Sequence, residues 1–570
     1  MTILELLEKH CPIAKTISEE TLFALMEDNA ETEYGKKYGF STIHSVADYK
    51  RQVPFSDYDD YAEYVSRMIK GEKNLLTIYP IDMYALTTGS SGTRKRIPVS
   101  DRALSINVAY CFDMPREVYK RYLYETTGDD SYEERRQIRL AMAAADHVED
   151  GTLLTNFSGG VYFAVKEDLL PNLCCPPEAM YGSSLTDYMY LKAFCALKGK
   201  DANMIGAPFM ATVSEFFHTI ETNWQSLCRD IELGRLNPEK HVSAVADSVN
   251  QAITPDPERA EELREIFRQG FDLPVVRKIW PTFGYIHAVG TGSFSAYTEK
   301  VRRYIGDIPM YLNTYGASEG IIATAAALNR TDCVMIPESG YYEFIPEEDM
   351  GLPEEELKER TLSIGELEVG KNYEIVITNL SGLYRYRIGD VISVKGFQGE
   401  SPVISFAYRR NQVLNVTGEK TNEKHIQSAV DRMAKETGIK VVDWTVYADY
   451  KSTPPHYIIF IETDPVIQSD IKPAVRDILE KGLAGANDYY REYIENGHLG
   501  RMELVVLQPE TYALYRDMLI YKGASANQLK PVHVIDNLLK ERFFFGLEEK
   551  EFGLPTASPS RRWTKARLMG

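Results

Sequence analysis

The sequence predicts an α/β fold with a large N-terminal domain, which includes a β-rich subdomain, and a smaller α+β C-terminal domain. Three observations support this fold class. Strand and helix patterns alternate from residue 285 to residue 328, as they do in proteins with a parallel sheet. The stretch 341–394 then becomes β-rich, and a mixed α+β pattern returns after about residue 410. We place the boundary near Asn411, which gives the domains 1–410 and 411–570.

In the N-terminal third, short helical patterns are mixed with β-rich pieces. Residues 82–87 (DMYALT) predict a strand, and Thr152–Glu167 (TLLTNFSGGVYFAVKE) predicts two strands joined by a glycine turn. From residue 185 to residue 269 apolar side chains recur every three or four positions, which predicts mostly helix. Gly270 follows this stretch and is expected to act as a C-cap.

The alternation that defines the fold class begins with a predicted strand at Tyr285–Gly290 and a predicted helix at Ser295–Gly306. A strand at 309–316 (PMYLNTYG) and a helix at 321–328 (IIATAAAL) follow. Ligands of parallel sheets bind at the carboxyl ends of the strands, so we expect a site there. Beyond the boundary, the patterns predict a helix at 423–438 and strands at 441–449 and 456–463.

Composition narrows the possible functions. The 570 residues predict roughly three or four structural units. A net charge of −19, from 83 acids and 64 bases, disfavours nonspecific binding of nucleic acids or anionic membranes. The seven cysteines show no zinc-type spacing, and no run of about 20 apolar residues exists to span a membrane. Because the N-terminus lacks a signal-peptide pattern, we expect a cytoplasmic protein in a reducing compartment.

The segment Thr87–Lys95 (TTGSSGTRK) has the composition of a phosphate-binding loop. Glycines allow backbone N–H groups to point into one concavity, hydroxyl groups add donors, and Lys95 adds a cation. The segment is not a Walker A loop, because G-x-x-x-x-G-K-[ST] occurs nowhere in the chain. The alternative is a flexible β-turn with solvated bases.

A second segment, Asn313–Ala326 (NTYGASEGIIATAA), lies at a predicted strand end. Glu319 within it is placed to reach a metal ion or a ligand. The alternative is a helix N-terminus, in which Ser318 is the cap and Glu319 interacts with the helix dipole.

A third segment is Leu380–Val394 (LSGLYRYRIGDVISV), in which Gly389–Asp390 is a strong hairpin signal. Asp390 could equally accept hydrogen bonds from a ribose diol. A hairpin leaves Arg385 and Arg387 unexplained, and these side chains could face a phosphate or a carboxylate.

With these three segments in order, the chain resembles the adenylate-forming superfamily and, more closely, the GH3 family of auxin-responsive acyl acid amido synthetases. The residues that carry the resemblance are TTGSSGTRK, YGASEG, YRYRIGD, the long segment from VGTGSFSAYTEK to YGASEG, YRRNQVLNVTGEKTNE and ANQLKP. The likeness runs from about Pro54 to Pro531. The first loop is closer to the general superfamily pattern, and Lys530 is followed by PVH rather than a basic residue, which leaves the acceptor open.

The resemblance implies an AMP-forming ligase that uses ATP and Mg²⁺, with a C-terminal domain that rotates between two steps. A carboxylic acid would react with ATP to give acyl-AMP and pyrophosphate, and an amine, usually an amino acid, would then displace AMP. The resemblance implies that the phosphates are bound by Thr88, Gly89, Ser90, Ser91, Gly92, Thr93 and Lys95, that Mg²⁺ is bound by Glu319, and that the ribose is bound by Asp390. The adenine and the acyl group would be lined by Tyr315, Gly316, Ala317 and Ser318 on one side and by Gly292 and Ser293 on the other. Arg409 or Arg410 would lie at the hinge, and the mobile domain would contribute Lys420 and Lys530, with Lys530 at the α-phosphate.

Several of these assignments have plainer alternatives. Taken alone, Lys530 is an exposed loop lysine, Lys420 is a surface base, and Arg409 and Arg410 form a salt-bridged strand end. The expected partners are a small carboxylic acid and an amine, with no nucleic acid and no membrane. The sequence predicts neither which acid or amine is used nor the oligomeric state.

Three other functions compete with amide formation. An acyl-CoA ligase shares the first step but uses a thiol acceptor. The segment Gly316–Gly320 matches G-x-S-x-G between a predicted strand and helix, which would make Ser318 a hydrolase nucleophile. That alternative gives no role to the Gly89–Lys95 loop or to YRYRIGD. The third function is a nucleotide-binding regulator without turnover.

Overall fold

The computed structural model describes most of the 570 residues. The described residues are 1–86, 95–129, 131–181, 188–237, 244–291, 294–409, 414, 419, 421–450, 452, 454–495, 497, 499–522, 524, 529, 531–535 and 537–546. The chain divides into two compact units, which we call unit 1 (Met1–Gln412 with Gly523–Lys530) and unit 2 (Val413–Lys522 with Pro531–Gly570).

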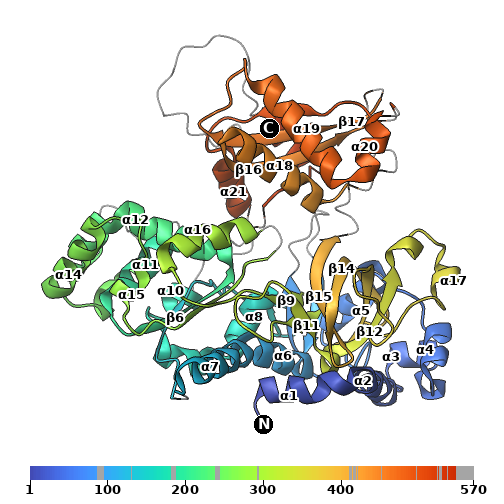
Figure 1. The fold of residues 1–570 in the computed structure, drawn as a ribbon. Helices are drawn as coiled ribbons and strands as arrows, with labels where there is room; N and C mark the ends of the chain where they lie inside the picture. Colours follow the sequence, from blue (N-terminus) through green and yellow to red (C-terminus); the bar gives the residue numbers. More distant parts are fainter. Residues whose placement is uncertain are drawn as a thin grey trace. The chain divides into compact units, whose positions relative to one another are not determined.

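The described residues of unit 1 form three β-sheets (Figure 1). A four-stranded sheet has the order β2 (Arg96–Ser100), β1 (Ile81–Leu86), β5 (Leu153–Thr155), β4 (Asp146–His147). A parallel sheet has the order β3 (Arg136–Arg139), β6 (Ala202–Phe209), β7 (Tyr285–Val289), β8 (Met310–Tyr311). A seven-stranded antiparallel sheet has the order β12 (Gly340–Pro346), β13 (Asn372–Asn379), β14 (Tyr386–Gln398), β15 (Ser401–Arg409), β11 (Cys333–Met335), β10 (Gly320–Thr324), β9 (Thr314–Ala317).

Helices pack around these sheets. They are α1 (Ile3–His10), α2 (Ala14–Asp28), α3 (Glu33–Tyr38), α4 (Val46–Gln52), α5 (Tyr58–Ile69), α6 (Asp101–Val108), α7 (Met114–Thr127), α8 (Phe157–Ala164), α9 (Lys166–Leu169), α10 (Glu178–Tyr181), α11 (Tyr188–Lys198), α12 (Met210–Leu233), α13 (Ala244–Ala252), α14 (Pro257–Arg268), α15 (Val276–Ile279), α16 (Ser295–Ile305) and α17 (Glu354–Leu357). Helix α12 packs against β6 and also contacts α11 and α16 (Figure 1). Phe216, Phe217 and Ile220 of α12 are at most 1% exposed, and each buried side chain of this size contributes roughly 2 kcal/mol.

The parallel sheet confirms the fold class that the sequence predicts. Strand β7 and helix α16 match the predicted strand and helix at 285–290 and 295–306. The prediction of a single strand at 309–316 is wrong, because this stretch forms β8 in the parallel sheet and β9 in the antiparallel sheet. The chain therefore passes from one sheet to the other next to the second predicted motif.

Two other local predictions are wrong, and a third is confirmed but incomplete. The stretch 321–328 is not a helix, because residues 320–324 form β10 between β9 and β11. The second predicted strand in Thr152–Glu167 is helix α8, capped by the Asn156 side chain. The mostly helical stretch 185–269 also contains strand β6, whose residues 202–207 are buried.

Gly389–Asp390 does not form the predicted hairpin. Both residues lie inside the long strand β14, and the pairing of β14 with β13 shifts register between Glu374 and Val376. Gly389 has a φ of +79°, a conformation that glycine adopts without steric cost. The dipeptide therefore makes an irregularity within a strand, which is one of the structural uses of a strand glycine.

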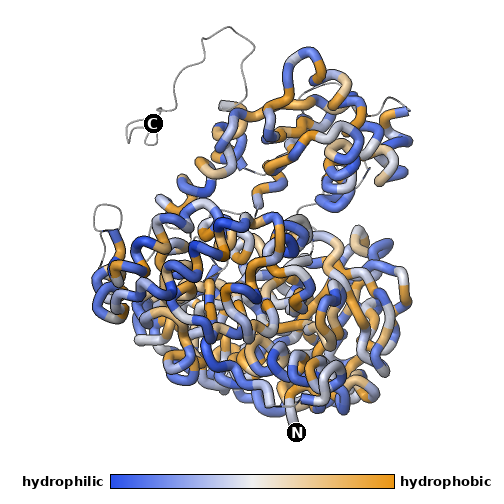
Figure 2. Tube along the Cα trace, turned by 60° about the vertical axis from the view of Figure 1, so that its left-hand side comes forward, coloured by the Kyte–Doolittle hydropathy of each residue, from blue (hydrophilic) through white to orange (hydrophobic). Residues whose placement is uncertain are grey.

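Unit 2 contains a three-stranded sheet in the order β16 (Lys440–Asp449), β17 (His456–Asp464), β18 (Glu503–Val506). Its helices are α18 (Glu423–Thr437), α19 (Lys472–Ala486), α20 (Asp488–Glu495), α21 (Thr511–Tyr521) and α22 (Leu538–Gly546). One core packs α18 and α19 against the sheet and a second core packs α21 and α22, so helices cover both faces. The tube of Figure 2 shows hydrophobic segments running through these cores. The predicted helix at 423–438 and the two predicted strands are confirmed.

Candidate active site

The second predicted motif forms a tight hairpin between β9 and β10. Ala317 pairs with Gly320, so Ser318 and Glu319 are the two residues of the turn. Glu319 is only 8% exposed although it lies in a turn. This geometry contradicts the predicted helix N-cap. It also removes the strand–turn–helix context on which the hydrolase alternative for Ser318 depends.

The Glu319 carboxyl is buried and forms no ion pair with any described residue. Burial is the largest influence and raises its pKa; the Glu319 backbone N–H and the charges of Arg409 and Lys95 oppose this shift, while Asp390 adds to it. Among the described residues, no side chain forms an ion pair or a hydrogen bond with this carboxyl. Buried acids in such an environment occur preferentially where a ligand supplies the missing charge.

Asp390 lies close to Glu319, and each of its carboxylate oxygens has one partner among the neighbouring side chains. The Tyr315 hydroxyl donates to Asp390 Oδ2 at 2.8 Å, and Arg409 Nε lies 3.1 Å from Asp390 Oδ1. Arg409 also donates to the Ile388 carbonyl at 3.1 Å. Strand pairing places Asp390 opposite Arg409, which explains how two residues distant in the sequence meet. Each carboxylate oxygen has two lone pairs, so Asp390 can still accept hydrogen bonds from a ligand diol.

Lys95 is the first described residue after the glycine–serine loop. Its Nζ lies 5.3 Å from the centre of the Tyr58 ring, and the Arg96 N–H donates to the Tyr58 hydroxyl at 3.0 Å. Tyr58 is the first residue of α5, whose N-terminus has an Asp57 capping box. The charge of Lys95 also lowers the pKa of Glu319, so Lys95 lies within electrostatic range of this carboxyl.

The structure thus brings together five predicted residues from four segments of the sequence: Lys95, Tyr315, Glu319, Asp390 and Arg409. Gly316, Ala317 and Ser318 belong to the same hairpin as Glu319. The predicted residues that lie outside the described residues are Thr88, Gly89, Ser90, Ser91, Gly92, Thr93, Gly292, Ser293, Arg410, Lys420 and Lys530.

Arg385 and Arg387 face carboxylates, which is one of the two possibilities that the sequence left open, but these carboxylates belong to the protein itself. Arg385 is fully buried and forms two hydrogen bonds of 2.9 Å with the Glu343 carboxylate. Arg387 binds Glu374 through bonds of 2.9 and 2.6 Å. Both guanidinium groups lie over the Phe55 ring. These arginines compensate buried acids of the seven-stranded sheet and are not available to a phosphate.

Sequence reasoning missed two aromatic neighbours of the cluster. Tyr386 is 4% exposed, and burial followed by the charge of Glu319 raises its pKa. The Phe406 ring lies 6.3 Å from the Tyr315 ring and is 40% exposed. Tyr386 lies inside the YRYRIGD motif, and this position could have indicated a place near the site. Phe406 lies in none of the motifs, so the sequence contains no signal for it.

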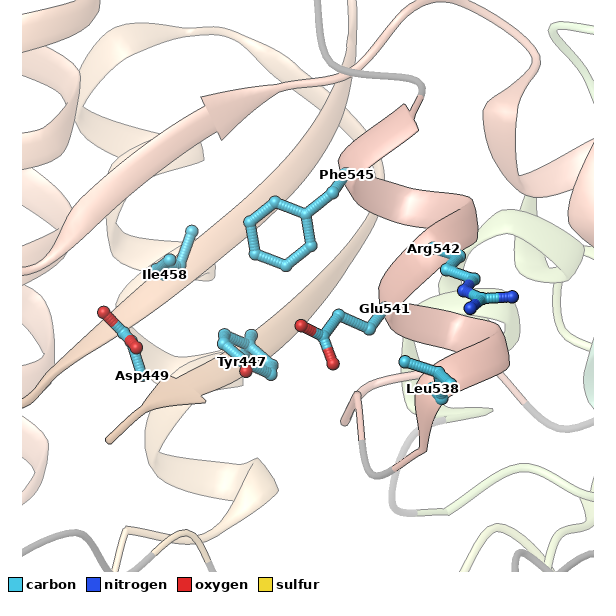
Figure 3. A pocket seen from close by; sticks show the side chains of 7 residues that line it. All are labelled: Tyr447, Asp449, Ile458, Leu538, Glu541, Arg542 and Phe545. Atoms are coloured by element: carbon cyan, nitrogen blue, oxygen red, sulfur yellow. The ribbon is translucent and has the colours of Figure 1, made fainter. Parts of the chain in front are cut away.

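Two pockets lie apart from this cluster. One in unit 2 has a volume of about 360 Å³ and lies between α22 and strands β16 and β17. In Figure 3, Tyr447, Glu541 and Phe545 face its interior, whereas Arg542 points away. The other, about 440 Å³, lies in unit 1 between α7, α9 and the start of β3. Neither pocket is lined by a predicted site residue. The candidate site is therefore defined by the cluster of Lys95, Tyr315, Glu319, Asp390 and Arg409.

The donor groups of the cluster fit a magnesium nucleotide. Mg²⁺ is usually held by one or two carboxylates together with substrate phosphates, and Glu319 supplies one buried carboxylate. Asp390 offers acceptors for a vicinal diol, and Lys95 offers a cation at the end of the glycine-rich loop. Among the described residues, no helix is both long and apolar enough to cross a membrane.

Comparison with solved structures defines the class of the fold. The chain superimposes on an acyl acid amido synthetase in complex with 2,4-DB with a TM-score of 0.81, at 24% identity and with 96% of each chain covered. The chain belongs to the GH3 family. The GH3 family N-terminal, central and C-terminal domains match residues 3–310, 333–409 and 424–538.

Named relatives match about nine-tenths of the chain. A jasmonoyl–L-amino acid synthetase from Oryza sativa subsp. japonica is 26% identical over 544 residues, covering 91% of each chain. An indole-3-acetic acid-amido synthetase from Oryza sativa subsp. indica is 28% identical, covering 90% of this chain and 87% of its own. A 4-substituted benzoates–glutamate ligase from Arabidopsis thaliana is 26% identical, covering 90% and 92%. As a member of this family, the chain is an enzyme of the ligase class.

Proposed function

We propose that the protein is an ATP-dependent amido synthetase that adenylates a small carboxylic acid and transfers the acyl group to an amino acid. Membership of the GH3 family supports the reaction class. The observation that carries the proposal is the buried Glu319 carboxyl, which has no ion pair among the described residues and lies beside Asp390, Tyr315, Arg409 and Lys95. The names of the relatives support an organic acid and an amino acid as substrates.

In the proposed mechanism, the first step is the attack of a carboxylate on the α-phosphate of ATP. Two negatively charged groups must approach each other, so the site has to neutralise charge and align the reactants. Glu319 would bind Mg²⁺, which withdraws charge from the phosphate oxygens. Lys95 and the loop residues Thr88–Thr93 would hold the β- and γ-phosphates. Asp390 would accept hydrogen bonds from the ribose, held in place by Tyr315 and Arg409.

The C-terminal domain, residues 411–570, would rotate between the first and the second step. We propose that Arg409 or Arg410 forms the hinge of this rotation and that the domain contributes Lys420 and Lys530 to the site. Lys530 would neutralise the charge that develops at the α-phosphate during adenylation. Tyr315, Gly316, Ala317 and Ser318, together with Gly292 and Ser293, would border the adenine and the acyl group. A cytoplasmic location is also proposed, since all seven cysteines are free thiols.

A hydroxamate-trapping screen tests the function. Purified protein, ATP and Mg²⁺ are incubated with a panel of carboxylic acids and hydroxylamine, and the best acid is then offered amino acids or CoA. We expect hydroxamate with at least one acid and an amide product with an amino acid. A thioester with CoA and no amide would identify an acyl-CoA ligase. The absence of carboxylate-dependent exchange of pyrophosphate into ATP across the panel would leave only the regulator.

Lys530→Ala tests the role of the C-terminal domain. This variant should slow pyrophosphate exchange about 100-fold while ATP affinity changes little, because Lys530 acts where charge develops. An unchanged exchange rate would remove Lys530 from the site without affecting the assignment of Glu319.

A further inference from the structure

The Glu319 hairpin is fixed from outside by the buried side chain of Asn379, the last residue of β13. Asn379 is 2% exposed, and its Nδ2 donates to the Glu319 backbone carbonyl at 2.8 Å. Its Oδ1 accepts from the Ser381 and Leu383 N–H groups, each at 3.0 Å. One side chain therefore shapes the turn 379–383 and holds the residue that carries the buried carboxyl.

The same turn binds the strand that follows the glycine–serine loop. The Ser100 N–H donates to Ser381 Oγ at 2.9 Å, and Ser100 Oγ donates to the Leu380 carbonyl at 2.7 Å. Ser100 ends β2 and caps helix α6. Beyond the turn the chain enters β14, which carries Asp390. The turn 379–383 thus joins three of the segments that contribute to the candidate site: the Glu319 hairpin, the strand after the glycine–serine loop and the strand with Asp390.

A second asparagine contacts the hairpin on its other side. Asn107 of α6 is 1% exposed, and its Oδ1 accepts from the Ile321 N–H at 3.0 Å. Its Nδ2 is buried and has no hydrogen-bond partner among the described residues. The two asparagines therefore differ in one respect that an experiment can use: Asn379 donates to the hairpin through its amide N–H, whereas Asn107 only accepts.

We propose that Asn379 is a positioning residue for adenylation, whose amide N–H fixes the Glu319 carbonyl and so holds the Glu319 carboxyl where it binds the metal–nucleotide. The inference rests on the proposed function. Because no described side chain holds the carboxyl directly, its place depends on the backbone of the turn. Small displacements of reacting groups cost large factors in rate, and a buried hydrogen bond that is lost costs about 10- to 100-fold.

Asn379→Asp and Asn107→Asp form a matched pair. Both replace a buried amide by a carboxyl beside the same hairpin, and both keep the acceptor that each asparagine uses. Only Asn379→Asp removes a donor that binds the hairpin. We expect Asn379→Asp to lower the kcat of pyrophosphate exchange about 10-fold or more and to raise the Mg²⁺ concentration needed for half-maximal rate. Asn107→Asp should change the kcat and the Mg²⁺ concentration for half-maximal rate by less than about twofold relative to the normal protein. Equal effects of the two variants would overturn the inference.

A further variant, Asn379→Ser, keeps the test decisive if Asn379→Asp is unstable. If Asn379→Asp does not fold, as judged by its thermal unfolding, Asn379→Ser replaces it, since serine keeps a shorter donor and adds no charge. We expect Asn379→Ser to show a smaller shift of the Mg²⁺ requirement in the same direction; an unchanged requirement would overturn the inference.

Combining Asn379→Asp with Glu319→Gln separates this inference from the proposed function. If Asn379 acts through Glu319, the added change should alter the residual rate of Glu319→Gln by less than about twofold. Independent, multiplying effects would overturn the positioning role. If Glu319→Gln itself exchanges pyrophosphate at the normal rate, the proposed metal role fails. If Glu319→Gln is impaired and Asn379→Asp matches Asn107→Asp, only the inference about Asn379 fails.

Discussion

Glu319 in unit 1 and His533 in unit 2 are both buried titratable groups, with 8% and 7% of their surface exposed, but their surroundings are opposite. His533 Nδ1 contacts Glu423, its Nε2 lies 3.1 Å from Asp443 Oδ1, and its ring stacks on Trp444 at 4.1 Å. Glu319 has no ion pair among the described residues. His533 thus belongs to a closed polar network, in which the protein supplies its charged partners. Glu319 lies in an open one, because no described residue forms an ion pair with it.

The pKa values of the two groups show what this difference means. Burial alone lowers the pKa of His533, but the hydrogen bonds and charges of Asp443 and Glu423 outweigh it and raise the pKa to about 9. The pKa of Glu319 is also raised, and there burial is the main cause. His533 therefore carries a charge that stabilises the fold. Among the described residues, none forms an ion pair with the Glu319 carboxylate, which is the property of a ligand-binding acid.

The largest effect that this comparison predicts is on activity, from Glu319→Gln. Glutamine keeps the size of the side chain but removes the charge that would bind Mg²⁺, so pyrophosphate exchange should fall about 1000-fold. The midpoint of thermal unfolding should stay the same or rise, because an uncompensated buried charge has been removed. A variant that unfolds at lower temperature with normal exchange would show that Glu319 has a structural role instead.

His533→Gln should have the opposite outcome. Removing the imidazolium leaves Glu423 and Asp443 as like charges around a buried position, which should destabilise the protein by about 3 kcal/mol or more. Thermal and urea unfolding of the full chain measure this loss. His456→Gln is the control, because His456 lies 3.9 and 3.7 Å from Asp449 and Glu503 and is more exposed, at 16%. Similar losses from both variants would contradict the special role of the buried network.

The same network predicts how stability depends on pH. The pKa of His533 is higher in the folded chain, at about 9, than the ordinary histidine value of 6.5, so its stabilising contribution is complete below pH 6.5 and is lost as the pH rises through 9. The loss between these values should be about 2–3 kcal/mol. Unfolding measured across this range should show the slope in the normal protein and not in His533→Gln. A slope that persists in the variant would assign it to other groups.

The sequence allowed the identity of the cluster to be predicted better than its geometry. The resemblance to the family implied roles for Glu319 and Asp390, whereas the residues taken alone left a helix N-terminus and a hairpin as alternatives. The partners of Asp390 could not be predicted in the same way. Tyr315 and Arg409 reach it through hairpin geometry and strand pairing across the seven-stranded sheet, and neither is encoded locally.

Local propensity failed where the surrounding fold decided the outcome. Residues 321–328 are rich in alanine and favour helix, yet Ile322 and Ala323 are fully buried in strand β10, between β9 and β11. The same limit explains Arg385 and Arg387, whose acidic partners Glu343 and Glu374 stand on other strands. The fold class survived these errors because it depended on the alternation of strands and helices over a longer stretch.

Asp390→Ala should give the smallest of these effects, because Asp390 belongs partly to each kind of environment. It is paired like His533, with Tyr315 and Arg409, but its oxygens keep lone pairs for a ligand like Glu319. Losing those bonds to the ribose should weaken ATP binding about 10-fold, measured by calorimetry, with a smaller change in exchange rate at saturating ATP. Arg409→Gln removes the ion pair and leaves Asp390 in place, so it should weaken ATP binding less. If Arg409→Gln has the larger effect, the guanidinium rather than the carboxylate contacts the nucleotide, and Asp390 would have to be grouped with His533 as part of a closed network.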